Sequence, residues 1–307
     1  MKITICGGGS LGLAYAALMH AQVSPRLYVR TASQASKINE LGVTATILGT
    51  ATHSPIQASA DPALLADSDL VICLVKYPDT QSLSQALQTS LSPTATVISL
   101  QTGVRPLIEY RSQLGNDRVV GGVSYLGAKR ISEASVEMGK NLRTVLGIDG
   151  VADEHAARAR ALVSLLADSE LEFELSDNIR MVIWEKLVIA CSQNAVSALT
   201  GSTFRQLRET SEWHQVLGDL IREVVAVAQA EGVQLSAGQI DRAFANWESL
   251  PDHRASTYTD LQFGRLTEVD ALNGSIVELG RQHGISAPLN ELLTCMIHMA
   301  EQAKTPR

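Results

Sequence analysis

The first thirty residues are the part of the chain that most constrains its fold. An apolar run at 2–6 leads into Gly7-Gly8-Gly9-Ser10-Leu11-Gly12, and an Ala/Leu-rich segment follows at 13–20. In this G-x-G-x-x-G spacing, glycine lets the backbone turn tightly and approach a pyrophosphate, whose charge is stabilised by the N–H groups at a helix N-terminus. The flanking strand and helix are in the order that this mechanism requires. The predicted cofactor-binding residues are Gly7, Gly9, Ser10, Leu11 and Gly12.

The second apolar run, Leu27–Val29, ends in a cation rather than in an acid. Sites for NAD usually place Asp or Glu at this strand end, where it accepts a hydrogen bond from the ribose 2′-hydroxyl. Here the position holds Arg30, followed by the hydroxyls of Thr31 and Ser33. A planar guanidinium can bind a 2′-phosphate through two hydrogen bonds. We therefore expect Arg30 to favour NADPH over NADH by at least about tenfold.

The first half of the chain alternates short apolar runs with helical segments, which indicates a parallel sheet. The expected strands are 3–6, 27–29, 70–74, 96–100, 119–123, 136–138, 144–148 and 171–175. Beyond residue 176 helical patterns dominate, and the expected helices are 178–199, 206–231, 237–247, 257–283 and 289–303. The sequence thus predicts an α/β fold with a mostly parallel, Rossmann-type NADP-binding domain at 1–176. A C-terminal all-helical substrate and catalytic domain follows at 177–307.

Two polar segments follow predicted strands and are expected near the cofactor. Lys76 comes directly after the run Val71–Val75, and Gln101-Thr102-Gly103 follows Val97–Leu100. In parallel sheets of this kind the ligand-facing loops lie at the carboxyl ends of the strands. We therefore expect Lys76 and Thr102 beside the bound nucleotide.

Composition restricts the class of protein. The 307 residues carry a net charge of −7 and contain no Lys/Arg run, which argues against nucleic acid as a partner. No apolar run reaches the roughly eighteen residues of a membrane span, so no membrane partner is expected. Four scattered cysteines, Cys6, Cys73, Cys191 and Cys295, lack metal-binding spacing and suit a reducing, cytoplasmic location.

A lysine stands on an apolar stripe of the predicted helix 178–199. The helical neighbours of Lys186 are Val182, Ile183, Ile189 and Ala190. A buried ammonium must find a partner or lose its proton, and either outcome suits a proton donor in carbonyl reduction. The pattern equally allows the lysine to reach solvent along its flexible stem. The neighbouring Glu185 also has apolar helical neighbours, so the stripe alone does not single out Lys186.

Motifs over nearly the whole chain are those of one enzyme family. They are the loop at 7–12, Arg30, Val75-Lys76-Tyr77, Leu100-Gln101-Thr102-Gly103, Trp184-Glu185-Lys186-Leu187, Asn194, and the segments 255–260, 265–274 and 284–288. The T-E-x-D-x-x-N-G pattern at 267–274 is far more specific than the glycine loop. On these residues the chain resembles the ketopantoate reductase family, the NADPH-dependent 2-dehydropantoate 2-reductases.

The resemblance implies a role for each matching position. Lys186 would be the general acid that protonates the carbonyl, and Glu268 would neighbour it and contact both the substrate hydroxyl and the cofactor site. Ser256 would bind the substrate carboxylate, and Asn194 the substrate hydroxyl. Lys76 and Thr102 would lie near the nicotinamide ribose and the substrate. The expected substrate is a small 2-oxo acid, ketopantoate first among them, and no metal is implied.

The chain departs from the family pattern at two positions. Thr102 stands where the family has Asn in L-Q-N-G, and Ala190 stands where it has Asn four residues after the lysine. Removing hydrogen-bonding groups from a substrate site changes its discrimination between substrates. The departures therefore favour a second hypothesis, in which the same chemistry acts on a different keto or hydroxy acid.

Two other classes of protein compete with a 2-oxo acid reductase. A non-catalytic NADPH sensor would need the nucleotide loop but neither a proton donor nor a carboxylate clamp. An opine dehydrogenase would be expected to use a histidine-centred site, and His214, His253, His283 and His298 lie in no recognisable active-site motif. Apolar helical segments near 217–230 and 289–300 are compatible with a homodimer.

Overall fold

The computed structural model describes residues 1–248 and 252–304, and the chain divides into two compact units. The first unit contains Met1–Gln101 and Pro106–Ile179, and the second contains Thr102–Arg105 and Arg180–Arg307. The sequence placed the division at 176/177. In the structure it lies after Ile179, and the segment Thr102–Arg105 joins the second unit. That segment packs on the second unit so closely that a Cβ on Gly103 would lie 2.5 Å from the carbonyl oxygen of Ala271.

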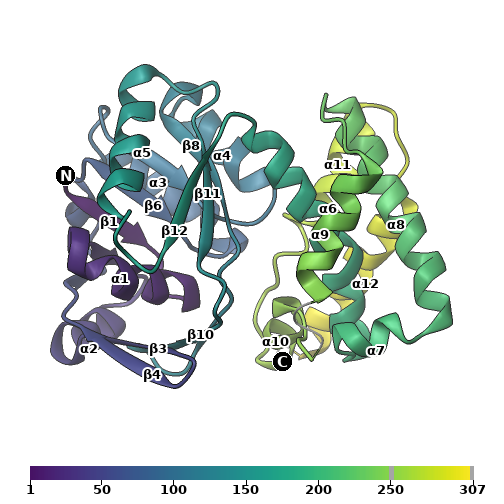
Figure 1. The fold of residues 1–307 in the computed structure, drawn as a ribbon, viewed down its shortest axis with the longest axis horizontal. Coiled ribbons are helices and arrows are strands. Elements are labelled where there is room, and N and C mark those ends of the chain that lie inside the picture. Colours follow the sequence, from purple (N-terminus) through teal and green to yellow (C-terminus); the bar gives the residue numbers. More distant parts are fainter. Residues whose placement is uncertain (249–251, 305–307) are drawn as a thin grey trace. The chain divides into compact units, whose positions relative to one another are not determined.

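The first unit is built on an eight-stranded, mostly parallel sheet in the order β12-β11-β8-β7-β6-β1-β2-β5 (Figure 1). Its strands are β1 (Ile3–Cys6), β2 (Arg26–Tyr28), β5 (Ala58–Ser59), β6 (Leu70–Cys73), β7 (Thr96–Ser99), β8 (Val119–Ser124), β11 (Arg143–Gly147) and β12 (Glu172–Ser176). Only the pairing of β11 with β8 is antiparallel. The central strands are buried on both faces, which explains their continuous β-branched runs. The predicted α/β class is confirmed.

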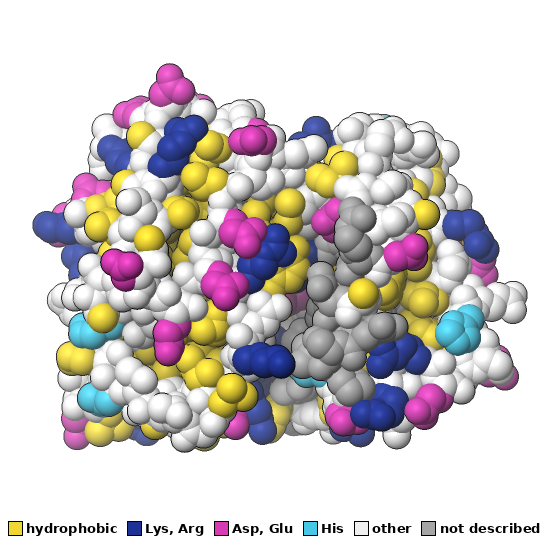
Figure 2. All heavy atoms as spheres, in the orientation of Figure 1, with side chains coloured by type: hydrophobic (Ala, Val, Ile, Leu, Met, Phe, Trp, Pro, Cys, Tyr) yellow, Lys and Arg dark blue, Asp and Glu magenta, His cyan; other side chains and the backbone are white. Residues whose placement is uncertain are grey.

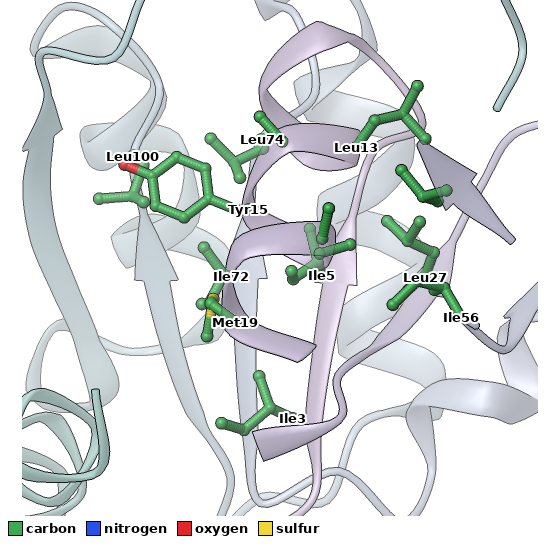
Figure 3. Packing of buried hydrophobic residues seen from close by; sticks show 14 of the residues in the cluster. Ile3, Ile5, Leu13, Tyr15, Met19, Leu27, Ile56, Ile72, Leu74 and Leu100 are labelled. Atoms are coloured by element: carbon green, nitrogen blue, oxygen red, sulfur yellow. The ribbon is translucent and has the colours of Figure 1, made fainter. Parts of the chain in front are cut away.

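Helix α1 (Ser10–Val23) is buried between this sheet and a second, smaller one. Its apolar residues surround the helix, as expected for a helix packed on more than one side. Figure 3 shows Leu13, Tyr15 and Met19 of α1 lying over residues of the main sheet such as Ile5 and Ile72. The hydroxyl of Tyr15 donates to Ser124 Oγ at 2.8 Å, so this buried polar group is satisfied.

The smaller sheet has four strands in the order β4-β3-β10-β9 and was only partly predicted. It consists of β3 (Val43–Ile47), β4 (Thr50–Ser54), β9 (Ala128–Arg130) and β10 (Ser135–Met138). The sequence indicated β10 alone. The hairpin β3–β4 turns through Leu48 and Gly49, both at positive φ. Four of the five β4 residues are exposed and only weakly apolar, so this strand had no clear hydrophobic pattern.

Short helices connect the strands of the first unit. They are α2 (Ala32–Leu41), η1 (Pro62–Leu65), η2 (Tyr77–Asp79), α3 (Thr80–Ser90), α4 (Arg105–Leu114), η3 (Asn116–Arg118) and α5 (Asp153–Leu165). The 3₁₀ turn η2 directly follows the Lys76 position, and α2 begins directly after the segment that contains Arg30. The loops at the carboxyl ends of β1, β2 and β6 are therefore fixed at both of their ends.

The second unit is all-helical over its described residues. Its helices are α6 (Ile179–Thr200), α7 (Phe204–Arg208), α8 (Ser211–Ala230), α9 (Ala237–Glu248), α10 (Ser256–Gln262), α11 (Asn273–Gln282) and α12 (Pro288–Lys304). Trp184, Leu187 and Val188 of α6 form a core with residues of α8 and α11. Each fully buried large apolar side chain contributes roughly 1.5–3 kcal/mol relative to an exposed one. None of the described helices is long and apolar enough to cross a membrane.

Two of the predicted helices are interrupted in the structure. The predicted helix 257–283 is wrong between α10 and α11, because Gly264 takes a left-handed φ of 62° and the residues 265–272 are not helical. The predicted helix 206–231 breaks between Arg208 and Ser211, where α8 begins after Thr210. The first break contains Glu268, one of the predicted catalytic residues.

Charged side chains are mixed on the visible surface. Figure 2 shows Lys and Arg interspersed with Asp and Glu on one face, without a continuous basic region on that face. The first unit nevertheless brings the Arg130 guanidinium to its glycine loop.

Candidate active site

The glycine loop has the tight backbone path that the sequence predicted. Gly7 has a φ of 123°, and a Cβ at this position would lie 2.8 Å from the carbonyl oxygen of Leu74. A Cβ on Gly12 would lie 1.8 Å from the carbonyl oxygen of Gly7. Gly7 therefore permits the turn against β6, and Gly12 permits α1 to pack directly on the loop. A side chain at either position would require the backbone to move.

Gly9 differs from these two glycines because its missing side chain faces open space. No heavy atom lies within 4 Å of the position that a Cβ would occupy. Gly9 is also the N-cap residue of α1, whose first turn has neither a side-chain cap nor an acidic residue. The N–H groups that begin α1 are thus oriented to receive an anion that can approach closely. These residues fit the diphosphate of a dinucleotide, with Ser10 and Leu11 in the first turn.

The end of β2 places Arg30 at the surface beside a carboxylate. The Arg30 side chain is 81% exposed, and its Nη1 lies 3.4 Å from Asp79, which belongs to η2. The hydroxyl of Thr31 accepts a hydrogen bond from the Gln34 N–H and so caps α2. Of the predicted phosphate-binding groups, Arg30 is therefore the one that carries the charge, while Thr31 mainly supports the helix start.

The structure places Lys76 and Thr102 in loops that follow neighbouring strands. Lys76 is half-buried between β6 and η2, and its carbonyl oxygen accepts from the Asp79 N–H. Thr102 is also half-buried and follows β7, but it belongs to the second unit. Arg105, at the end of the same segment, forms an ion pair with Glu278 of α11. This ion pair and the close approach of Gly103 to Ala271 fix the loop that carries Thr102.

Lys186 projects from the middle of α6 and has an altered proton affinity. Burial lowers the pKa of its ammonium to about 8, and the negative charge of Glu268 partly opposes this shift. The neighbouring Glu185 instead accepts a hydrogen bond from Gln239 of α9 at 2.9 Å. The structure thus separates two residues that the sequence could not distinguish, since the charge of Glu268 acts on Lys186 and Glu185 is held by α9.

Glu268 lies in the turn between α10 and α11, and its backbone is held from several sides. Its carbonyl oxygen accepts from the N–H groups of Ala271 and Leu272, and the N–H of Thr267 donates to Glu301. The buried Asn273 donates both to the Cys191 carbonyl oxygen of α6, at 2.8 Å, and to Asn290. Residues of the T-E-x-D-x-x-N-G pattern therefore fix the Glu268 turn against α6, the helix that carries Lys186.

Asn194 and Ser256 differ in their environments. Asn194 lies two turns after Lys186 on α6, and its Oδ1 is buried without a hydrogen-bond partner among the described residues. An unpaired buried oxygen is costly, so it suggests a donor supplied by a ligand. Ser256 is exposed at the first position of α10, and the preceding residue, Ala255, provides no side-chain cap. Its hydroxyl is accessible to a ligand.

The predicted site residues thus fall into two sets. The first unit holds Gly7, Gly9, Ser10, Leu11, Gly12, Arg30 and Lys76, and the second holds Thr102, Lys186, Asn194, Ser256 and Glu268. Within the second set the structure pairs Lys186 with Glu268 through their charges. Among the described residues, no group of His, Cys, Asp or Glu side chains could hold a metal ion.

Sequence reasoning missed three polar residues around these sets. Gln34 donates to the Gly8 carbonyl oxygen at 2.7 Å, Arg130 donates to the same oxygen at 3.3 Å, and Asn273 anchors the Glu268 turn. For Asn273 the signal was present, because it is part of the T-E-x-D-x-x-N-G pattern. Gln34 and Arg130 belong to no motif, and only the tertiary structure brings them to the glycine loop.

Comparison with known proteins identifies relatives along both units. Residues 3–149 match the family model described as ketopantoate reductase PanE/ApbA, and residues 178–301 match the model of the C-terminal part of the same family. A curated 2-dehydropantoate 2-reductase of Halobacterium salinarum is 28% identical over 304 residues, covering 98% of this chain and 99% of that protein.

Solved structures show the same fold over the full length. A PanE/ApbA family ketopantoate reductase from Ralstonia eutropha superposes with a TM-score of 0.90 at 29% identity, with 100% of each chain covered. A D-mandelate dehydrogenase in complex with NADH and anilino(oxo)acetate gives a TM-score of 0.88 at 24% identity, also with 100% of each chain covered. The latter likeness concerns the fold.

Proposed function

Since the chain belongs to the ketopantoate reductase family, we propose that it reduces a 2-oxo acid to a 2-hydroxy acid with NADPH, ketopantoate being the leading substrate. The observation that carries this proposal is the Lys186–Glu268 pair. A lysine whose pKa is lowered to about 8 can hold a proton at neutral pH and give it up readily. A non-catalytic NADPH sensor would have no need for such a proton donor.

The reaction adds a hydride and a proton across the carbonyl group. NADPH, held by the glycine loop and Arg30, would supply the hydride that the carbonyl carbon accepts. Lys186 donates its proton to the carbonyl oxygen, and Glu268 keeps the ammonium charged and in place until that step. The sum is 2-oxo acid, NADPH and a proton giving 2-hydroxy acid and NADP⁺. In this scheme the Nζ proton is replaced from solvent after each turnover.

The other second-unit residues bind and orient the acid. Ser256 donates its hydroxyl to the substrate carboxylate, and the unpaired Oδ1 of Asn194 accepts from a substrate hydroxyl. Thr102 offers a hydroxyl where the family has an amide, while Ala190 offers no polar group. We therefore propose ketopantoate as the leading substrate and a different keto or hydroxy acid as the alternative that these two positions favour.

A substrate panel tests this function. The protein is mixed with NADPH and, in separate reactions, with ketopantoate, pyruvate or 2-oxoisovalerate, and the loss of NADPH absorbance is followed. We expect turnover of at least one of the three, with the highest kcat/KM for ketopantoate. Tight cofactor binding without turnover on any of them would favour the NADPH-sensor hypothesis. Preference for another acid would support the alternative substrate.

The choice of NADPH rests on Arg30. In an Arg30→Gln variant we expect the Kd of NADPH to rise about tenfold and the Kd of NADH to stay unchanged, because one charge-assisted contact to the 2′-phosphate is lost. Both constants can be measured from the fluorescence of the bound reduced cofactor. Lys2→Gln is the matched control, because it removes one positive charge at the other end of the strands, where Lys2 pairs with Asp67. An equal loss of affinity for NADPH and for NADH would contradict the role of Arg30.

A cytoplasmic location is part of the proposal. Cys6, Cys73, Cys191 and Cys295 are all free, and such thiols suit a reducing compartment.

A further inference from the structure

A second arginine reaches the glycine loop from outside the motif. Arg130 ends β9 in the smaller sheet, more than a hundred residues after the loop. Its Nη1 donates to the carbonyl oxygen of Gly8 at 3.3 Å, and its side chain is exposed. A guanidinium has five N–H donors, and this bond engages one of them. The Arg130 side chain therefore reaches the loop with donors that a ligand can use.

The Gly8 carbonyl oxygen does not depend on Arg130 for its hydrogen bond. The buried side chain of Gln34 donates to it at 2.7 Å and also donates to the Glu133 carbonyl oxygen at 3.0 Å. Gln34 thus ties the glycine loop to the β9–β10 connection, and a Cβ on Gly8 would collide with it at 2.5 Å. Because Gln34 already holds this backbone, the weaker bond from an exposed Arg130 adds little to the stability of the loop.

The two arginines at the nucleotide site contact different features. Arg30 lies beside Asp79, at the loop that follows β6. Arg130 lies at Gly8, the residue directly before Gly9, whose missing side chain leaves open space at the uncapped start of α1. The N–H groups at the start of α1 and the Arg130 guanidinium therefore present their hydrogen-bond donors at the same short segment of the glycine loop. That stretch is where a dianionic diphosphate fits.

We propose that Arg130 binds the diphosphate of the nicotinamide dinucleotide, while Arg30 reads its 2′-phosphate; this inference rests on the proposed use of NADPH. The planar guanidinium matches two oxygens of a phosphate group, and the diphosphate is common to NADPH and NADH. Arg130 therefore contributes to affinity for both cofactors and leaves the preference between them unchanged.

The test is cofactor affinity in the absence of any 2-oxo acid, so it does not depend on catalysis. In an Arg130→Gln variant we expect the Kd of NADPH and the Kd of NADH to rise together, each about tenfold, the scale of one charge-assisted hydrogen bond. Their ratio stays within about twofold of the wild-type ratio. Lys129→Gln is the matched control: it removes the same charge from the adjacent residue of β9, which points to the other face of the strand.

The remaining outcomes of these binding measurements also decide the proposal. Arg130→Lys keeps the charge but not the planar fork, so we expect it to restore part of the affinity. Unchanged affinity in Arg130→Gln, or equal losses in the Lys129→Gln control, would overturn the assignment while the proposed reaction could still stand. A rise in the Kd of NADPH alone would also overturn the assignment, because Arg130 would then contact the 2′-phosphate. If the unmodified protein binds NADPH but reduces no 2-oxo acid, the proposed function fails and the Arg130 assignment is still decided by these constants.

Discussion

A Lys186→Ala variant should lose at least about 10²-fold in kcat, the usual scale for removing a group that transfers a proton in the rate-determining step. The substitution deletes the ammonium whose pKa the Glu268 charge raises, and it leaves a methyl group on an apolar stretch of α6. We therefore expect the variant to fold and to bind NADPH with unchanged affinity. Steady-state turnover and cofactor fluorescence measure the two quantities separately.

The pH profile makes this prediction specific to Lys186. Because its pKa is lowered to about 8 and the donor must be protonated, kcat/KM for reduction should fall as pH rises through about 8. Glu268 raises this pKa, so Glu268→Gln should move the loss of activity to lower pH. Glu185→Gln is the control, since Glu185 is bound to Gln239 and should leave the profile unchanged. A change in kcat below about threefold for Lys186→Ala would exclude it as the proton donor.

The second large effect concerns the glycine loop. We expect Gly12→Ala to lower the free energy of unfolding by about 3 kcal/mol, at the upper end of the cost of overpacking. Its Cβ would lie 1.8 Å from the carbonyl oxygen of Gly7, a backbone atom that cannot rotate away. Alanine's better helix propensity, worth up to about 1 kcal/mol, does not offset this clash. Urea denaturation of the unmodified protein and of the Gly12→Ala variant gives the difference in the free energy of unfolding.

Gly9→Ala is the matched comparison within the same loop. Its Cβ would enter open space at a φ of −80°, so we expect unchanged stability. The same methyl group would occupy the space that a diphosphate approaches, and we expect the Kd of NADPH to rise about tenfold or more. If Gly9→Ala destabilised the protein while Gly12→Ala did not, the described loop geometry would be contradicted.

The sequence predicted the parts of the fold that have strong periodic or motif signals. The strands β1, β6 and β7 are continuous apolar runs because both of their faces are buried. The smaller sheet was largely missed, since exposed β4 and the three-residue β9 carry little apolar pattern. The predicted helix 257–283 failed because apolar periodicity continues through a segment that Gly264 and the Glu268 turn interrupt.

The candidate site was predictable to the level of residue types. The stripe around Lys186 indicated an unusual lysine, but only the structure distinguishes it from Glu185 through their different partners. The contribution of Arg130 and Gln34 could not be read from the chain, because they reach Gly8 through tertiary packing and not through spacing. Likewise, the unpaired Oδ1 of Asn194 is a property of its surroundings.

The proposed function depends on one step, the transfer of a hydride from NADPH to the carbonyl carbon of a 2-oxo acid. The most direct measurement uses NADPH deuterated at the transferable C4 position, with ketopantoate, and mass spectrometry of the acid after a single turnover. We expect pantoate carrying one deuterium at C2, and none of this product from the Lys186→Ala variant in the same time. The proposed hydride transfer would be contradicted if the protein bound the cofactor but ketopantoate, pyruvate and 2-oxoisovalerate all remained unreduced and unlabelled.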